Sequence, residues 1–297
     1  MCMTNLSEDT ISSIDSRLLN NLKTKGWTII DNVLNQEELE KLKVSIDDYL
    51  IKNNFDTNSF DGFLWIEDSI CWSLEVVKAV VNPSALKLIR SFLETENIHF
   101  CHQPIITVLK PAKQLIGCYP EGGWHSDYPY RDYFFPNNQW PKKPELGVQY
   151  NICIDDFKSE NGATQFVLGS HELCTPPPEE FNLNGTRPGI GIHKNVVQIE
   201  APAGSAIVYN SKTWHRRCDE LNISGKRRIA ILNAVTPSWI PPMIDKQVLS
   251  KQYARSDINK ALSVTEKKEV KLMCNSKTAK QPKGTPKLFK KCVAMER

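Results

Sequence analysis

No stretch of this sequence approaches the roughly 20 consecutive apolar residues that a membrane-spanning helix needs. The first residues also lack the basic-then-apolar pattern of a secretory signal. None of the nine cysteines stands in a Cys-x-x-Cys pair, and their odd number and scatter argue against a disulfide framework or a zinc finger. We therefore expect reduced thiols in an intracellular, cytoplasmic protein, with an organellar address left open.

Internal repeats are also missing, and charge is unevenly spread. The segment 266–297 carries ten lysine or arginine residues and three glutamates, and its stretch 277–287 has almost no large apolar side chains to build a core. The rest of the chain is slightly acidic, which argues against a nucleic-acid partner beyond weak contacts of this basic segment. We predict a single domain over residues 1–260 and a basic, flexible tail over 261–297.

Helical patterns come first along the chain and strand patterns follow. Asn35 and Glu38 form a capping-box pattern that opens a helix to about residue 52, and Asn82-Pro83 opens another to about residue 93. A short strand at 27–31 precedes the first of these helices. From about residue 97 to 240, short β-rich runs alternate with turn signals, which is typical of a sandwich or barrel. The expected strands lie within 98–109, 147–154, 164–168, 196–199, 205–209 and 227–235. This order predicts an α+β domain with helices packed outside a β core.

The chemistry of the chain centres on His125-Ser-Asp127. In an extended segment, alternating side chains place His125 and Asp127 on the same face. One imidazole and one carboxylate are two of the three ligands of a facial iron site. With six histidines and 34 acidic residues in 297, however, about 0.7 such pairs are expected by chance. The pair needs a third ligand from elsewhere in the chain.

His215 is the best candidate for that ligand, because it follows a glycine turn and an apolar strand at 203–210. The other histidines have plainer interpretations. We expect His99 and His102 to be core residues, His171 to be structural and His193 to be exposed.

A cation follows His215 at the start of an apolar strand. Placing Arg227 or Arg228 inside a β core is costly unless the side chain meets an anion. If a metal here acts with 2-oxoglutarate, the distal carboxylate of that cosubstrate is such an anion, and arginine offers it a bidentate fork. Strand alternation lets only one of the two arginines face inward, and we favour Arg227.

Taken together, these segments resemble the phytanoyl-CoA dioxygenase-like (PhyH) family of iron(II)/2-oxoglutarate-dependent oxygenases. The likeness rests on Trp124-His-Ser-Asp127, on Glu160-Asn-Gly-Ala-Thr164 leading to Gly169-Ser-His171, and on the segment from Gly204 to His215 with Arg227 beyond it. It covers about residues 20–240. One departure is Leu168, where family members often carry proline before Gly-Ser-His.

The resemblance implies a double-stranded β-helix, the jelly roll or cupin-like fold, with N-terminal helices on its flank. It also implies catalytic iron(II) held by His125, Asp127 and His215, with Arg227 binding 2-oxoglutarate. Gln149 and Thr164 would be further cosubstrate contacts. Dioxygen would be the second cosubstrate, and ascorbate the reductant. A carboxylate at Asp127 argues against halogenation, which needs a small residue there.

The loop after the metal pair should form the wall of a substrate pocket, with Tyr128, Tyr130 and Arg131 as substrate contacts. Arg216 and Arg217 add positive charge near the mouth. We expect a small, carboxylated metabolite, oxidised at an unactivated C–H bond by hydroxylation or by oxidative cyclisation or desaturation, in a specialised biosynthetic pathway. Two other classes stay open: a cupin-like metal isomerase or hydrolase that does not use 2-oxoglutarate, and a non-catalytic jelly-roll binding module.

Overall fold

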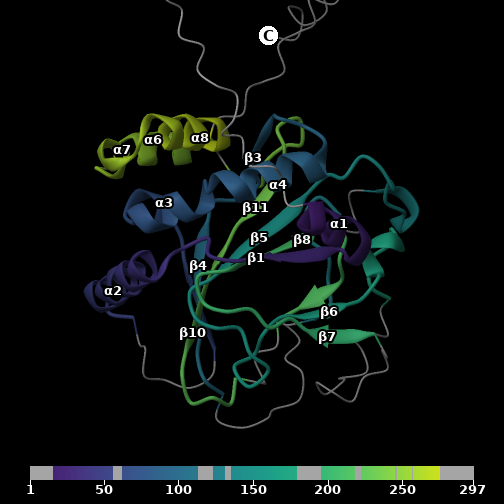
Figure 1. Ribbon diagram of the computed structural model, residues 1–297, viewed down its shortest axis with the longest axis horizontal. Coiled ribbons are helices and arrows are strands. Elements are labelled where there is room, and N and C mark those ends of the chain that lie inside the picture. The colour runs from purple at the N-terminus through teal and green to yellow at the C-terminus, as the bar shows by residue number, and fades with distance from the viewer. Residues whose placement is uncertain are drawn as a thin grey trace, which may run out of the picture.

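Two antiparallel sheets form the centre of the computed structural model (Figure 1). The structure describes residues 16–55, 62–112, 123–130, 135–178, 195–217, 222–244, 246–255 and 257–274. The larger sheet has the order β1 (Trp27–Ile30), β8 (Ala206–Asn210), β5 (Val148–Cys153), β10 (Arg228–Leu232), β4 (Ile105–Leu109) and β2 (Phe63–Ile66). Beside that path, β11 (Ala234–Pro237) pairs with β5 and with β3 (Ile98–Phe100). The smaller sheet has the order β7 (Val196–Gln198), β6 (Gln165–Val167) and β9 (His215–Arg216).

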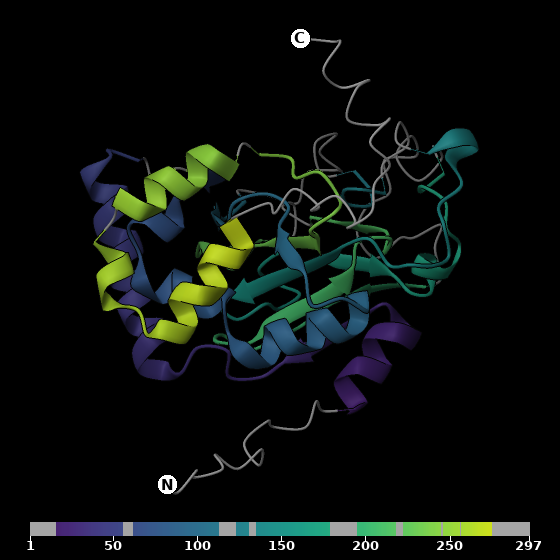
Figure 2. The ribbon, with the colours of Figure 1, turned by 90° about the horizontal axis from the view of Figure 1, so that it is seen from above.

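Helices cover the outer face of the larger sheet (Figure 2). They are α1 (Ser16–Lys25), α2 (Gln36–Lys52), α3 (Leu74–Val80), α4 (Pro83–Leu93), α6 (Lys246–Arg255), α7 (Ile258–Ala261) and α8 (Val264–Cys274). Short 3-10 turns lie elsewhere along the chain: η1 (Ser69–Cys71), η4 (Pro136–Asn138) and η5 (Ser170–Glu172). In the described part of the chain, none of the helices is long and apolar enough to cross a bilayer.

Strand alternation gives the larger sheet two different faces. On β5, Val148, Tyr150 and Ile152 pack in the main core with the helices. Between them, Gln149 and Asn151 point to the opposite face, where they line a cavity between the sheets. β5 is buried on both faces, and it is apolar toward the helices and polar toward the cavity. This arrangement positions the functional site.

The predicted elements are largely confirmed. Asn35 caps α2 through the predicted capping box, accepting a hydrogen bond from the Glu38 amide while the Glu38 carboxylate accepts one from the Asn35 amide. Asn82 caps α4, with Pro83 in its first turn. The strand β2 was not among the predicted strands.

The boundary at residue 260 needs correction. α8 follows it, and Val270, Met273 and Cys274 are at most 1 % exposed within the main core. Glu269 on the same helix accepts a 2.7 Å hydrogen bond from Arg90 of α4. The packed body therefore reaches at least Cys274, while the remainder of the expected tail lies outside the described residues.

Candidate metal centre

Backbone pairing brings the two predicted ligand segments together. His125 and His215 form an antiparallel bridge, and each amide donates a 3.0 Å hydrogen bond to the other carbonyl. Two residues along, the Asp127 amide donates to the carbonyl of Ser211 at 2.9 Å. Residues about 90 positions apart in sequence are thus fixed by the main chain, before any side-chain interaction.

The side chains of His125, Asp127 and His215 converge so that their ligand atoms all lie within 4.8 Å of one another. Nε2 of His215 is 3.2 Å and Nε2 of His125 is 3.9 Å from the Asp127 carboxylate. Two imidazole nitrogens and one carboxylate form the donor set that non-haem iron(II) sites use.

Hydrogen bonds on the far side of each ring set its tautomer. Nδ1 of His125 lies 2.8 Å from the carbonyl of Gly123, and Nδ1 of His215 lies 2.9 Å from that of Thr213. Because a carbonyl can only accept, each Nδ1 carries the proton and donates it. With Nδ1 used in this way, Nε2, which faces Asp127, is the ring nitrogen that can ligate a metal. The three residues fit a divalent iron ion.

The centre is closed on one side and open on the other. The side chain of His215 is 7 % exposed, whereas that of His125 is 46 % exposed. Of the three side chains, that of His125 is therefore the most accessible from solvent.

Tyr209 on β8 is a site residue that the sequence did not single out. Its hydroxyl donates to the Asp127 carboxylate at 3.4 Å and accepts from the Asn151 amide at 3.4 Å. Burial, with the nearby Asp127 charge, raises the pKa of Tyr209 well above its usual value, so the hydroxyl stays a donor. Strand alternation on β5 and β8 could have placed Asn151 and Tyr209 on the cavity face. Nothing in the sequence, however, showed which residues of these strands lie next to the three ligand residues.

A cavity of about 540 Å³ opens beside the three ligands. The two predicted cosubstrate contacts, Gln149 and Thr164, line it, as does the predicted substrate contact Tyr128. The Tyr128 hydroxyl donates to the carbonyl of Pro241 at 2.6 Å, which ties the wall after the metal pair to the segment preceding α6.

The orientation predicted for the two arginines is the reverse of that in the structure. Arg228 is 5 % exposed and lines the cavity, where its guanidinium lies 4.0 Å from the centre of the Phe157 ring and donates to the carbonyl of Gly162 at 2.7 Å. Arg227 points to the other face of the sheet and forms an ion pair with Asp47 on α2. Neighbouring side chains point to opposite faces of a strand. Arg227 can therefore reach Asp47 on α2 only when Arg228 points into the cavity.

Other predicted contacts need revision. Tyr130 is fully buried away from the cavity, in a cluster with Trp140 and Leu146, and its hydroxyl accepts from the Leu146 amide at 2.7 Å, so we withdraw it as a substrate contact. Arg131 lies outside the described residues. Of the two arginines after His215, Arg217 lines the cavity and stacks over the Phe63 ring at 4.1 Å. Arg216 instead donates to Gln165 in the smaller sheet.

The remaining histidines agree with the prediction in part. His99 is fully buried and His171 is 4 % exposed, in agreement with structural roles, and His193 lies outside the described residues. His102, which we expected in the core, instead lines the cavity.

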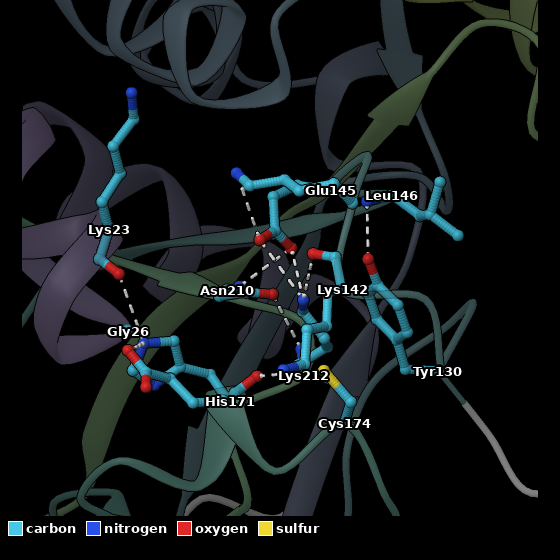
Figure 3. Close-up of polar contacts among 12 residues, drawn as sticks. Lys23, Gly26, Tyr130, Lys142, Glu145, Leu146, His171, Cys174, Asn210 and Lys212 are labelled. Carbon is cyan, nitrogen blue, oxygen red and sulfur yellow. Dashed lines mark hydrogen bonds and ion pairs between the residues drawn. The ribbon is translucent and has the colours of Figure 1, made fainter. Parts of the chain in front are cut away.

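A buried ion pair supports the ligand segment from behind (Figure 3). Lys212 Nζ lies 3.0 Å from the Glu145 carboxylate, which also accepts from the side chain of Asn210 at 3.1 Å. The Lys212 amide donates to the Asn210 side chain at 3.0 Å, and its carbonyl accepts from the Ser126 hydroxyl at 3.3 Å. This network fixes the turn that leads to His215 and joins it to the segment carrying His125 and Asp127.

Comparison with known proteins places these features in a family. Residues 22–230 match the family model of phytanoyl-CoA dioxygenase (PhyH). An uncharacterised protein of Mycobacterium tuberculosis is 33 % identical over 98 residues, which are 33 % of this chain and 32 % of that protein. The protein named dioxygenase olcK, of Penicillium canescens, is 30 % identical over 128 residues, which are 41 % of this chain and 35 % of that protein. These matches span about a third of the length of the relatives.

Solved structures share the fold. HygX from Streptomyces hygroscopicus, solved with nickel and 2-oxoglutarate bound, aligns with a TM-score of 0.59 at 14 % identity, over 76 % of this chain and 88 % of that chain. The epimerase SnoN, solved with Fe3+, alpha ketoglutarate and nogalamycin RO, aligns with a TM-score of 0.54 at 17 % identity, over 75 % of this chain and 83 % of that chain. The predicted jelly-roll core with flanking helices is confirmed.

Proposed function

Since this chain belongs to the phytanoyl-CoA dioxygenase (PhyH) family, we propose that it is an iron(II)- and 2-oxoglutarate-dependent dioxygenase acting on a small, carboxylated metabolite. The observation that carries the proposal is the convergence of His125, Asp127 and His215 beside a cavity that also holds a buried arginine. A metal isomerase or hydrolase that does not use 2-oxoglutarate would not require that arginine, and a binding module would not require the three metal-ligating side chains.

His125, Asp127 and His215 would hold the iron, and three ligands leave open positions for a chelating cosubstrate and for dioxygen. Iron(II) bound there would activate dioxygen, the oxidant, which would oxidise 2-oxoglutarate to succinate and carbon dioxide and, with its remaining two-electron capacity, an unactivated C–H bond of the substrate. The chain contributes position and the exclusion of water. Its carbonyl groups at Gly123 and Thr213 hold the two imidazoles so that Nε2 of each faces the metal position.

Arg228 would bind the distal carboxylate of 2-oxoglutarate. Its guanidinium is held in place by the Phe157 ring and the Gly162 carbonyl. Gln149 and Thr164 line the same cavity and offer an amide and a hydroxyl to the cosubstrate. A buried cation that meets this carboxylate is worth about 1.5–3 kcal/mol of binding free energy.

The substrate would enter on the side of His125, the most exposed ligand. Arg217, stacked over Phe63, offers a cation to a substrate carboxylate, and Tyr128 offers an aromatic wall. The cavity volume of about 540 Å³ has to hold 2-oxoglutarate as well, which favours a small substrate. Hydroxylation and oxidative cyclisation or desaturation are both compatible with this arrangement.

Anaerobic addition of iron(II), ascorbate and 2-oxoglutarate tests the proposal. The wild-type protein should develop the weak visible charge-transfer band of the iron–2-oxoglutarate chelate, and His215→Ala should not. A wild-type protein without the band would refute the proposed cosubstrate. A band that survives His215→Ala would refute the ligand assignment.

A further inference from the structure

His102 occupies the cavity wall without a role in the proposed chemistry. It lies between β3 and β4, half-buried, and it lines the same cavity as the three metal ligands. Asp127 lines this cavity as well. His102 nevertheless does not belong to the metal group, whose ligand atoms all lie within 4.8 Å of one another. The position of His102 in the cavity wall is suited to contact a molecule bound beside the metal.

Strand register puts His102 at the level of the metal. Tyr209, which contacts Asp127, pairs with Gln149, and Gln149 pairs with Ala234 on β11. The Ala234 carbonyl then accepts a 2.8 Å hydrogen bond from the amide of Cys101. His102 follows directly, so it stands at the edge of the row of residues that passes the metal.

The proposed cosubstrate site lies elsewhere along the strands. On β10, Arg228 pairs with Leu109, while Leu232 pairs with Ile105, the residue next to the loop that carries His102. These two pairs are four residues apart, or about 13 Å at the usual rise of a strand. A cosubstrate that extends from the metal toward Arg228 therefore leaves the His102 side of the cavity to another molecule.

The ring of His102 has a fixed hydrogen-bonding character. Its Nδ1 lies 2.7 Å from the carbonyl of Gln103, which can only accept, so Nδ1 carries a proton. Burial lowers the pKa of His102 from its usual value, which favours the neutral ring. In a neutral ring with a protonated Nδ1, Nε2 is an acceptor. Among the described residues, the hydrogen bond of this ring is the one between Nδ1 and the Gln103 carbonyl.

The loop that carries the ring is held in place at several points. The Cys101 carbonyl accepts from the Met243 amide at 2.8 Å, and the Pro104 carbonyl accepts from the Ser69 hydroxyl at 2.8 Å. Next to His102, the Gln103 side chain donates to the Glu67 carboxylate at 3.1 Å, and both line the cavity. An acceptor on a fixed loop beside a carboxylate is suited to a ligand that donates hydrogen bonds.

We propose that His102 is a specificity-determining residue whose Nε2 accepts a hydrogen bond from a hydroxyl or amino group of the substrate. The inference rests on the proposed function and adds to it the second polar group of the substrate. A carboxylate held by Arg217 and a donor held by His102 would fix the molecule at two points and present the carbon between them to the metal. The substrate class is thus a hydroxy- or amino-carboxylate.

A panel of matched ligands tests the inference in the anaerobic iron–2-oxoglutarate protein. The panel consists of propanoate, butanoate, pentanoate and hexanoate, each with its terminal hydroxy and amino derivative. Binding beside the metal is followed as a perturbation of the visible chelate band. In the wild type, the best donor-bearing member should bind about tenfold or more tightly than its unsubstituted partner. The two series distinguish a hydroxyl from an amine.

Two variants assign the preference to the residue. His102→Phe removes the acceptor and should abolish the preference, whereas His102→Gln keeps a carbonyl acceptor and should retain much of it. The inference is overturned if no donor-bearing member binds better than its partner, or if His102→Phe keeps the preference. The chelate band in each variant shows that the metal site is intact. Failure of the proposed function would look different, because the band itself would not form with 2-oxoglutarate.

Discussion

Replacing Arg228 should raise the concentration of 2-oxoglutarate that the protein needs, and replacing Arg227 should not. Arg228→Met keeps a long, unbranched side chain and removes the guanidinium that lies over the Phe157 ring. If that guanidinium binds the distal carboxylate, about 1.5–3 kcal/mol of binding free energy is lost. The half-saturating concentration then rises about 10- to 150-fold.

Arg227→Met is the matched control, one residue away on the opposite face of the strand. Its ion pair with Asp47 joins side chains that are 29 % and 46 % exposed, so it contributes at most about 1 kcal/mol to the free energy of unfolding. The 2-oxoglutarate requirement should stay within about twofold of the wild type, since this ion pair lies outside the cavity.

The assay is an anaerobic titration of each iron-loaded variant with 2-oxoglutarate, followed by the visible chelate band. Thermal unfolding of the same samples shows whether Arg228→Met keeps the fold. Our assignment is refuted if Arg227→Met raises the requirement more than Arg228→Met does. It is also refuted if the folded Arg228→Met protein binds 2-oxoglutarate as tightly as the wild type.

Three further predictions concern the scaffold. Glu145→Gln leaves the buried Lys212 charge unpaired and should lower the free energy of unfolding in a denaturant titration by about 3–5 kcal/mol, whereas Lys143→Gln should change it by less than about 1 kcal/mol. A chain ending at Cys274 should melt like the full-length protein, but one that also lacks α8 should lose about 5 kcal/mol, because three buried side chains go with it. Burial lowers the pKa of His171 below its usual 6.5, so below pH 6.5 the unfolded chain binds a proton that the folded one does not. As the pH decreases below 6.5, the free energy of unfolding should therefore fall by up to about 1.4 kcal/mol per pH unit. His171→Gln should flatten that slope.

The grouping of His125, Asp127 and His215 as a candidate metal centre could be predicted from sequence because their chemistry and spacing leave few alternatives. His125 and Asp127 share a face in any extended segment, and His215 follows a glycine turn into an apolar strand. The choice between Arg227 and Arg228 was different in kind. Alternation shows that one of them faces inward, but the phase depends on Asp47, which is 180 residues away and on a helix. No local pattern contains that information.

His102 and α8 were mispredicted for related reasons. The hydrogen-bonding state of the His102 ring depends on the carbonyl of Gln103, and its position depends on a cavity formed by strands distant in sequence. The apolar side of α8 is short and lies among lysines and glutamates, so its composition looked like that of the basic segment that follows. In both cases tertiary packing determined the structure, and local sequence propensity alone could not predict it.

The central claim is that His125, Asp127 and His215 hold an iron that uses dioxygen and 2-oxoglutarate together. The most direct test supplies isotopically heavy dioxygen to the iron-loaded protein with 2-oxoglutarate and ascorbate and measures the mass of the succinate formed. We predict succinate that carries one heavy oxygen atom from the wild type, and none above background from His125→Ala. Unlabelled succinate from the wild type, or equal labelling from the variant, would contradict the account.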